Sequence, residues 1–237
     1  MAGHTCSTCN NKLCVSKVPV FGMLNHEDLS EIIKLTNHPI FKKGEHLCHE
    51  GDELATLFIV NEGRVKLSKF NIEGKEQILN LVGEGDIFGE YHLLSDFEPY
   101  NFSAIALTDT KICTLSKENF DYLLDKHPSI SRKILAELSR KLIRTENLAQ
   151  NLSSVNTDAK VAYVLLEFAE NYGTDDGEEV RIEIPVSREE MANYAGVTRE
   201  TMSRKLSILI KEGIIDTVGN KVMIIKDLEA LHGISGT

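Results

Sequence analysis

Thiol side chains near the N-terminus are the most reactive group that the sequence offers. Cys6, Cys9 and Cys14 stand in a polar segment, with two and then four residues between them. A C-x2-C pair is common in zinc sites made of four thiolates. The same pair is the motif of thiol oxidoreductases, where it normally opens a helix beside a βαβ unit. Here it precedes short strands, so an enzyme is the less favoured alternative, while Cys48 in an apolar stretch is expected to be a buried thiol.

A second group of residues, near the C-terminus, has the types and spacing needed to recognise DNA. Ser187 followed by Glu190 is a capping box that begins a helix. After a short turn at Ala195-Gly196-Val197, a second helix opens with polar side chains, as a helix-turn-helix requires. Arginine can bind guanine and glutamate can accept from cytosine in the major groove. The expected DNA-binding residues are Thr198, Arg199, Glu200, Ser203 and Arg204; the alternative is an ordinary charged surface helix.

The distribution of charge supports DNA binding, although the chain of 237 residues carries a net charge of -10. Residues 186–237 hold seven Lys and Arg against seven Asp and Glu, and residues 198–211 hold four against one. A local basic face is what DNA contact needs. The sequence contains no membrane-length apolar run and no export signal, so we expect a cytoplasmic protein. It also lacks a phosphate-binding loop or a catalytic triad, so we expect no enzyme.

The middle of the chain has the texture of an antiparallel β-roll. A short helix at about His26–Thr36 is followed by short apolar stretches separated by glycines. The expected strands are His46–His49, Leu57–Val60, Val65–Phe70, Gln77–Val82, Phe102–Leu107 and Lys111–Leu115. We therefore expect a cysteine-containing tail over residues 1–18 and a β-roll sensor domain over residues 19–126.

A long helix, at about Ser129–Val155, is expected to follow the roll and to form a homodimer. Its apolar residues step by three and four, which is the seam of a short coiled coil. The seam residues are Leu135, Leu138, Leu142, Thr145, Ala149 and Leu152. The alternative is that this helix only packs on the roll. The dimerisation helix is assigned to residues 127–156.

The remaining residues, 157–237, are expected to form a winged helix-turn-helix. A helix at about Thr157–Tyr172 precedes an acidic loop at Thr174–Glu179 and a strand at Val180–Pro185. Two strands that flank Gly219-Asn220 predict a hairpin, the wing of the motif. The fold class is α+β.

The order of these parts resembles the CRP/FNR family of bacterial transcription regulators. The most specific matches are Gly83-x-Gly85-Asp86-x-x-Gly89-Glu90 in the roll and Glu200-x-x-Ser203-Arg204 in the recognition helix. The second pattern is that of the FNR branch and implies a palindromic TTGAT-like site. Arg199 instead matches the cyclic-AMP receptor branch, whose half-site contains TGTGA. The resemblance also implies a homodimer on double-stranded DNA and, for an activator, contact with RNA polymerase.

The resemblance argues against cyclic AMP as the effector. In cyclic-AMP receptors an Arg-Ser pair binds the cyclic phosphate, but this chain has Tyr100-Asn101 at those positions. Without the arginine the phosphate loses its bidentate partner. We therefore expect no cyclic AMP, and we expect Gly89 and Glu90 to be structural turn residues.

The cysteines resemble those of FNR, in which three N-terminal cysteines and one distant cysteine hold a [4Fe–4S] cluster. The resemblance implies Cys6, Cys9, Cys14 and Cys113 as the ligands, although the second gap is four residues here and five in FNR. A disulfide switch between Cys113 and a tail cysteine, a zinc site, or a regulator without any cofactor are the alternatives. The sequence thus predicts a transcription regulator that responds to oxygen or redox state.

Overall fold

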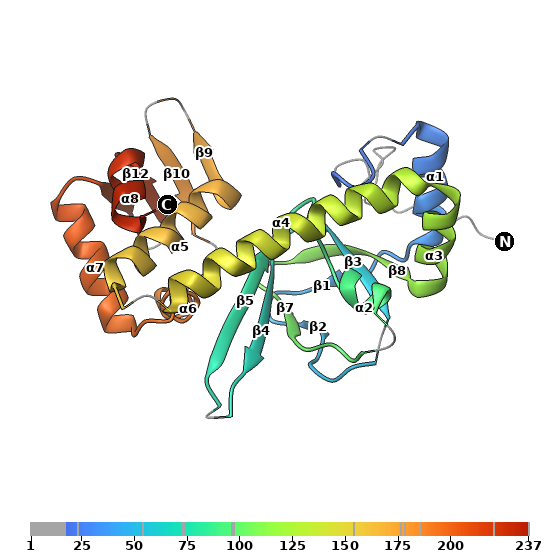
Figure 1. Cartoon of the computed structure of the whole chain (residues 1–237), viewed down its shortest axis with the longest axis horizontal. Helices are drawn as coiled ribbons and strands as arrows, with labels where there is room; N and C mark the ends of the chain where they lie inside the picture. Colours follow the sequence, from blue (N-terminus) through green and yellow to red (C-terminus); the bar gives the residue numbers. More distant parts are fainter. Residues whose placement is uncertain are drawn as a thin grey trace. The chain divides into compact units, whose positions relative to one another are not determined.

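The computed structural model describes residues 18–237, apart from residues 23, 54, 73, 96, 97, 154, 176, 178, 185, 220 and 237. Cys6, Cys9 and Cys14 therefore lie outside the described residues. The chain divides into two compact units, one ending at Lys141 and the other beginning at Leu142 (Figure 1). No helix in the described part of the chain is long and apolar enough to cross a membrane.

The first unit is built on two antiparallel sheets of four strands, in the orders β1-β8-β3-β6 and β2-β7-β4-β5. These sheets confirm the predicted β-roll. The strands are β1 (Ile40–Phe41), β2 (His46–Cys48), β3 (Thr56–Glu62), β4 (Val65–Phe70), β5 (Glu76–Val82), β6 (Ile87–Phe88), β7 (Ser103–Ala106) and β8 (Thr110–Ser116).

The sheet that contains β3 and β8 has a different core on each face, because successive side chains of a strand point to opposite sides. Phe58 and Val60 of β3 belong to the core inside the roll, which also holds Cys48. Leu57 and Ile59 of the same strand belong to a core that includes residues of the covering helices. Cys113 of β8 lies in this second core, opposite Ile59 in the strand register. The two described cysteines therefore face different cores.

Four helices accompany the sheets, and their ends follow from local capping. They are α1 (His26–Leu35), α2 (Glu90–Leu94), α3 (Lys117–Lys126) and α4 (Pro128–Ser153). The side chains of Asn25 and Ser116 accept hydrogen bonds from the first turns of α1 and α3. Pro128 starts α4, where its missing N–H costs nothing. The sequence predicted α1 and α4 but missed α2 and the short strands β1 and β6.

The first half of α4 has one apolar stripe in the core and another on the surface. Ile130 and Ile134 are buried, and Leu138 is half-buried against the same core. Leu135 and Leu142 are 62% and 60% exposed. Packing on the roll, which was the alternative to a dimer seam, is thus real for one stripe but leaves the seam residues Leu135 and Leu142 uncovered. The side chain of Leu152 lies outside the described residues.

The second unit contains the predicted helices and hairpin around one small sheet. Its elements are α5 (Thr157–Tyr172), β9 (Gly173–Asp175), β10 (Val180–Glu183), α6 (Arg188–Tyr194), α7 (Arg199–Lys211), β11 (Ile215–Val218), β12 (Val222–Ile225) and α8 (Leu228–Ser235). The strand order is β11-β12-β10-β9. The prediction of a loop at Thr174–Glu179 was wrong at its start, because β9 pairs with β10 there. The sequence also missed α8.

Candidate DNA-binding and sensing sites

Helices α6 and α7 form the predicted helix-turn-helix, and local contacts define both helix starts. Ser187 and Glu190 make the complete capping box, each side chain accepting from the backbone N–H of the other residue. Gly196 in the turn has φ of 62°, a conformation that glycine adopts without strain. The hydroxyl of Thr198 accepts from the backbone N–H of Thr201, 3.2 Å away, and so begins α7. The turn and the two caps therefore fix where the second helix starts.

One face of α7 is buried and the other presents the predicted DNA-binding residues to solvent. Met202, Leu206 and Leu209 are buried. The exposed residues of the first turns include all five that the sequence singled out: Thr198, Arg199, Glu200, Ser203 and Arg204. An N-terminal polar face of this kind is the part of a recognition helix that contacts base edges.

The charges on this face suit the contacts with DNA bases that the sequence predicts. The pKa of the Glu200 carboxyl lies below its usual value, because a backbone N–H at the helix start and the Thr198 hydroxyl hydrogen-bond to it and Arg199 is nearby. Glu200 is therefore an ionised acceptor at neutral pH. Lys205, which contributes to the basic count of the helix, pairs instead with Asp158 of α5 at 2.7 Å. Arg199 and Arg204 thus remain the two cations at the exposed start of α7.

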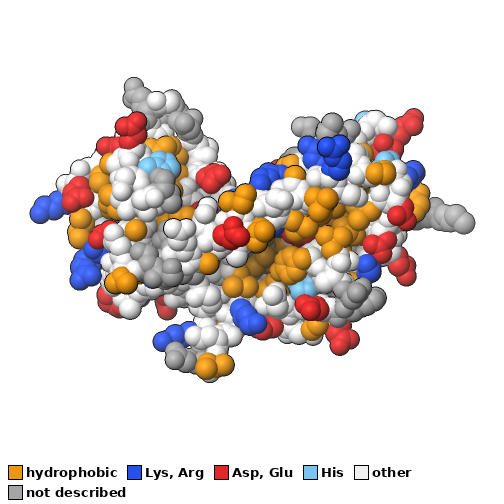
Figure 2. Space-filling view, viewed as in Figure 1, with side chains coloured by type: hydrophobic (Ala, Val, Ile, Leu, Met, Phe, Trp, Pro, Cys, Tyr) orange, Lys and Arg blue, Asp and Glu red, His pale blue; other side chains and the backbone are white. Residues whose placement is uncertain are grey.

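Most of the predicted seam residues on α4 whose side chains are described are exposed. Leu142 and Ile143 are more than half exposed, and so is Leu135 two turns earlier. Thr145 and Ala149, further along the same predicted seam, are also exposed. Figure 2 shows apolar side chains gathered on the surface over the part of α4 in the first unit. Leu138, another residue of the predicted seam, is only partly exposed because it packs against the core.

An aromatic cluster occupies the part of the roll where the sequence lacks the phosphate-binding arginine. Tyr100 is buried, and its hydroxyl donates to the carbonyl of Thr56 at 2.8 Å. Its ring lies 4.6 Å from that of His92 and 5.4 Å from that of Phe102, between centroids. Gly89 has φ of 87°, and a Cβ there would lie 2.5 Å from the same Thr56 carbonyl oxygen. Gly89 is thus a structural glycine, as the sequence predicted.

Glu90, the residue after it, does more than form a turn. It is the first residue of α2 and is completely buried. The ammonium of Lys141 on α4 lies 2.6 Å from Oε1 of Glu90 and donates to the carbonyl of Ile87 at 2.7 Å. A buried carboxylate is tolerated only when it is paired in this way. The expectation for Glu90 was therefore incomplete, because the residue anchors the long helix to the roll.

Cys113, the predicted fourth ligand, is buried and only 2% exposed. Its core also contains Val18, Val20 and Phe21, the first apolar residues after the cysteine-containing tail. Nδ1 of His38 lies 3.2 Å from its Sγ atom. The sequence missed His38, because 75 positions separate the two residues. Cys48, in contrast, lies in the inner core, where burial raises the pKa of its thiol to about 12.

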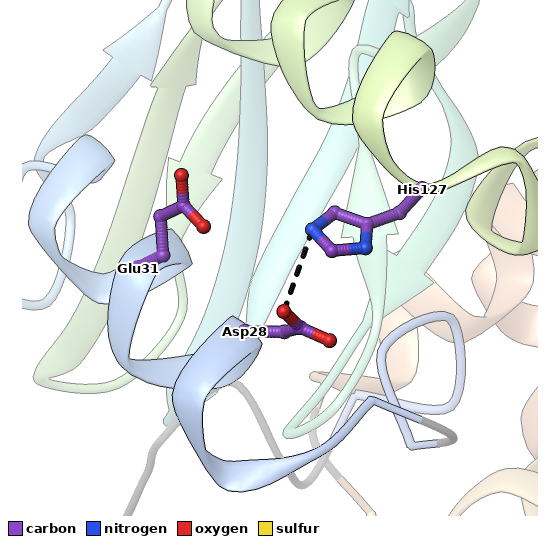
Figure 3. A group of neighbouring side chains, drawn as sticks. All are labelled: Asp28, Glu31 and His127. Carbon is purple, nitrogen blue, oxygen red and sulfur yellow. Dashed lines mark ion pairs between the residues drawn. The ribbon is translucent and has the colours of Figure 1, made fainter.

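A second group of possible metal ligands joins α1 to the junction of α3 and α4. Asp28, Glu31 and His127 each offer a ligand atom within 4.8 Å of the others (Figure 3). However, Glu31 accepts from the hydroxyl of Tyr122 at 2.8 Å and from the ammonium of Lys126. A cation placed there would meet a lysine and lose both hydrogen bonds. The group is better described as a set of polar contacts that link α1 to α3 and to the start of α4.

The two units together define a class of protein, and comparisons with known proteins give its family. A β-roll followed by a winged helix-turn-helix is the build of a DNA-binding transcription regulator. Residues 40–127 match the model of the cyclic nucleotide-binding domain, and residues 159–234 match that of the Crp-like helix-turn-helix domain. The chain belongs to the CRP/FNR family of transcription regulators, which are not enzymes.

Three relatives show how wide this family is. The chain is 34% identical over 218 residues to the probable transcriptional regulator flp of Lacticaseibacillus casei, covering 91% of this chain and 96% of that protein. It is 30% identical over 206 residues to the CRP-like cAMP-activated global transcriptional regulator of Mycobacterium tuberculosis, covering 86% and 92%. It is 27% identical over 235 residues to the anaerobic regulatory protein of Pasteurella multocida, covering 98% and 83%.

Proposed function

We propose that this regulator is a homodimer that reads a palindromic TTGAT-like site and responds to oxygen or redox state through its cysteines. Relatives of the chain are named both for cAMP and for anaerobic regulation. The residues of the roll favour the second kind of signal. Tyr100 is buried where cyclic-AMP receptors place the phosphate-binding arginine, and the carboxylate of Glu90 is already paired with the ammonium of Lys141. We therefore expect cyclic AMP to have no effect.

The observation that carries the sensing proposal is the place of Cys113. It shares a core with Val18, and Cys14 is four residues before Val18. We propose that Cys14 reaches Cys113, because four residues of chain can span up to about 14 Å. Cys48 belongs to the other core, which does not contain Val18. This arrangement supports Cys113 as the distant partner of the tail cysteines.

These residues suit a [4Fe–4S] cluster. Cys6, Cys9, Cys14 and Cys113 would supply the four thiolates that such a cluster requires. The His38 ring could donate a hydrogen bond to the Cys113 sulfur, a contact that tunes the potential of iron–sulfur sites. The bound cluster would supply one-electron chemistry and sensitivity to oxygen. The part of the chain after residue 17 would then respond to whether the tail is bound at Cys113.

A disulfide switch is the second candidate, and the His38–Cys113 contact favours it. The thiolate is the reactive form of cysteine, and Nδ1 of His38 lies where it can take the proton of the Cys113 thiol. Joining Cys113 to a tail cysteine would remove two protons and two electrons, which an oxidant such as oxygen or peroxide would accept. In the reducing cytoplasm such a bond is regulatory and not structural.

The content of iron and acid-labile sulfide in protein purified without air tests these proposals. A cluster held by four cysteines gives a brown protein with about four irons per chain. Replacing Cys9, Cys14 or Cys113 by Ala should abolish both colour and oxygen dependence, whereas Cys48→Ala should keep them. A colourless protein whose DNA affinity follows a thiol reductant would favour the disulfide. DNA binding that ignores oxygen, reductant and metal would refute every sensing role of these cysteines.

The recognition helix makes the DNA proposal specific. Glu200, Ser203 and Arg204 are assigned to bases of the TGA part of the half-site, with Arg204 on guanine and Glu200 on cytosine. Arg199 would contact phosphate or an outer guanine. Selection of bound duplexes from a random library would show whether the half-site is TTGAT-like or TGTGA-like. A dimer also explains a palindrome, because its two recognition helices are related by two-fold symmetry.

A further inference from the structure

A buried carboxylate in the second unit joins three helices. The side chain of Glu167, on α5, is only 8% exposed. The hydroxyl of Tyr194, the last residue of α6, donates to its Oε2 at 2.5 Å. On the other oxygen, Nε of Arg144 on α4 lies 3.3 Å from Oε1. Because these partners come from the long helix and from the helix-turn-helix, Glu167 connects the two.

Neighbouring contacts hold both partners of this carboxylate in place. Arg144 also donates to the Oδ1 atom of Asn171 at 3.2 Å, and Asn171 donates to the backbone carbonyl of Glu167 at 2.7 Å. The ring of Tyr194 stacks on Phe168 with 5.9 Å between centroids. Two adjacent residues of α5 therefore hold the ring and the hydroxyl of Tyr194. This leaves the tyrosine little freedom to move independently of α5.

Burying a carboxylate costs the fold stability, so the contacts of Glu167 point to a role in positioning the helices that they join. Burial raises the pKa of the Glu167 carboxyl, while the Tyr194 hydrogen bond and Arg144 oppose that rise. Val161 and Leu165 of α5 are also buried, but apolar contacts of this kind are not directional. The hydrogen bond from Tyr194 is directional, and the Arg144 ion pair adds a charge contact at Oε1, so the two together favour one placement of the helices.

The position of Tyr194 makes the link relevant to DNA binding. Tyr194 directly precedes the turn that leads into α7, and the turn bond from Val197 N–H goes to the carbonyl of Ala192 in the same helix. A shift of Tyr194 would therefore move the start of the recognition helix. Arg144 in turn is two residues from Leu142, which is exposed on α4.

We propose that Glu167 is a positioning residue for DNA recognition, which transmits the placement of the Arg144 segment of α4 to α6 through Tyr194. The role requires DNA binding by α7 but no particular cysteine chemistry. DNA affinity should depend on the Arg144–Glu167 pair as a unit.

This role is tested by measuring affinity for a DNA duplex that the native protein selects from a random library. The test therefore assumes no particular half-site. Arg144→Met and Glu167→Gln should each weaken binding about tenfold, and the double variant should be no weaker than the weaker single variant. Arg144→Lys, which keeps the charge, should recover most of the affinity. Arg140→Met is the matched control, because Arg140 pairs with Glu137 on the exposed side of the same helix and should change affinity less than twofold.

Folding and assembly are measured beside affinity, by circular dichroism and sedimentation. If Glu167→Gln alone does not fold, the neutral pair Arg144→Gln with Glu167→Gln carries the test and should bind about tenfold more weakly than the native protein. Independent, multiplicative losses in the two single variants would overturn the proposal. So would affinities within twofold of the native value in folded variants, or losses that the Arg144→Lys variant shares in full.

Discussion

Nδ1 of His38 lies 3.2 Å from Sγ of Cys113, although the two residues are 75 positions apart. A β-bridge between their neighbours, Asn37 and Thr114, holds them together. The backbone N–H groups of these neighbours donate to each other's carbonyls at 3.0 and 2.9 Å. The backbone pairing therefore brings His38 and Cys113 side by side, and their side chains then make the contact.

If the protein holds the proposed cluster, His38→Ala should make it more sensitive to oxygen. Loss of a hydrogen bond to a ligating sulfur lowers the potential of an iron–sulfur site and eases its oxidation. We expect at least about a twofold faster loss of colour in air-saturated buffer, since outer contacts of metal ligands commonly have effects of this size or larger. His26→Ala, which alters an exposed histidine of α1, is the control. Equal rates in the two variants would mean that His38 does not act on Cys113.

Arg204→Ala should reduce both affinity and sequence preference. Removing a bidentate contact with guanine costs about 1–3 kcal/mol on the selected site and less on a site with that base pair changed. Fluorescence anisotropy with both duplexes measures the difference. Lys211→Ala removes an equal charge from the other end of α7 and should lower affinity only slightly. If Arg204→Ala weakens both duplexes equally, Arg204 contacts phosphate alone.

The exposed stripe of α4 should be needed for assembly. Leu135→Lys combined with Leu142→Lys would place charges in the seam, and sedimentation should then report a monomer that binds the full palindrome poorly. Leu135 and Leu142 contribute little to the monomer's core, so the variant should remain folded. Val155→Lys changes a residue that is 97% exposed outside the seam and should leave the dimer intact. A dimer in both variants would move the interface elsewhere.

Lys141→Met should destabilise the first unit strongly. It leaves the Glu90 carboxylate buried without its counterion, a change that costs about 3–5 kcal/mol. Adding Glu90→Gln should recover much of the loss, because the buried charge is then gone. Urea unfolding followed by circular dichroism measures both. Lys42→Met, which breaks an exposed pair with Asp109, should show no measurable loss. A small loss for Lys141→Met would mean that the Glu90 carboxylate does not depend on Lys141 for its stabilisation.

Cys48 should make the protein less stable at alkaline pH. Burial raises the pKa of its thiol from 9.0 to about 12. Its contribution is therefore complete below pH 9 and is lost as the pH rises from 9 toward 12, because the unfolded chain releases the proton first. Between pH 8 and pH 10 the native protein should lose about 1 kcal/mol more than Cys48→Ala. Urea midpoints at the two pH values give this difference; equal losses would place the thiol in contact with water.

Local signals explain which parts of the fold could be predicted. The capping box at Ser187 and the glycine turn at Gly196 act within a few residues, and the structure contains both. The two-residue strands β1 and β6 could not be predicted, because their pairing with β8 and β3 is distant in sequence.

The same reason separates the predicted and the missed parts of the sites. The recognition face of α7 follows from one helical period, so its exposed residues were all found. Lys141 and Glu90 are 51 positions apart, and Glu167 and Tyr194 are 27 apart. Nothing in the sequence indicates that these pairs meet, because a lysine or a glutamate on a helix is usually solvated.

The pleat of β8 decides which of the two cores Cys113 faces. Odd-numbered Cys113 and Leu115 face the helices, while even-numbered Ile112 faces the interior of the roll. A shift of one residue in the pairing of β8 with β3 would exchange these sides. One residue inserted between Ala106 and Thr110 could be absorbed by the turn, but one inserted within β8 ahead of Cys113 would turn the thiol toward Cys48 and away from Val18. We therefore expect chains of this kind to tolerate changes in the length of the β7–β8 turn, but not within the strand.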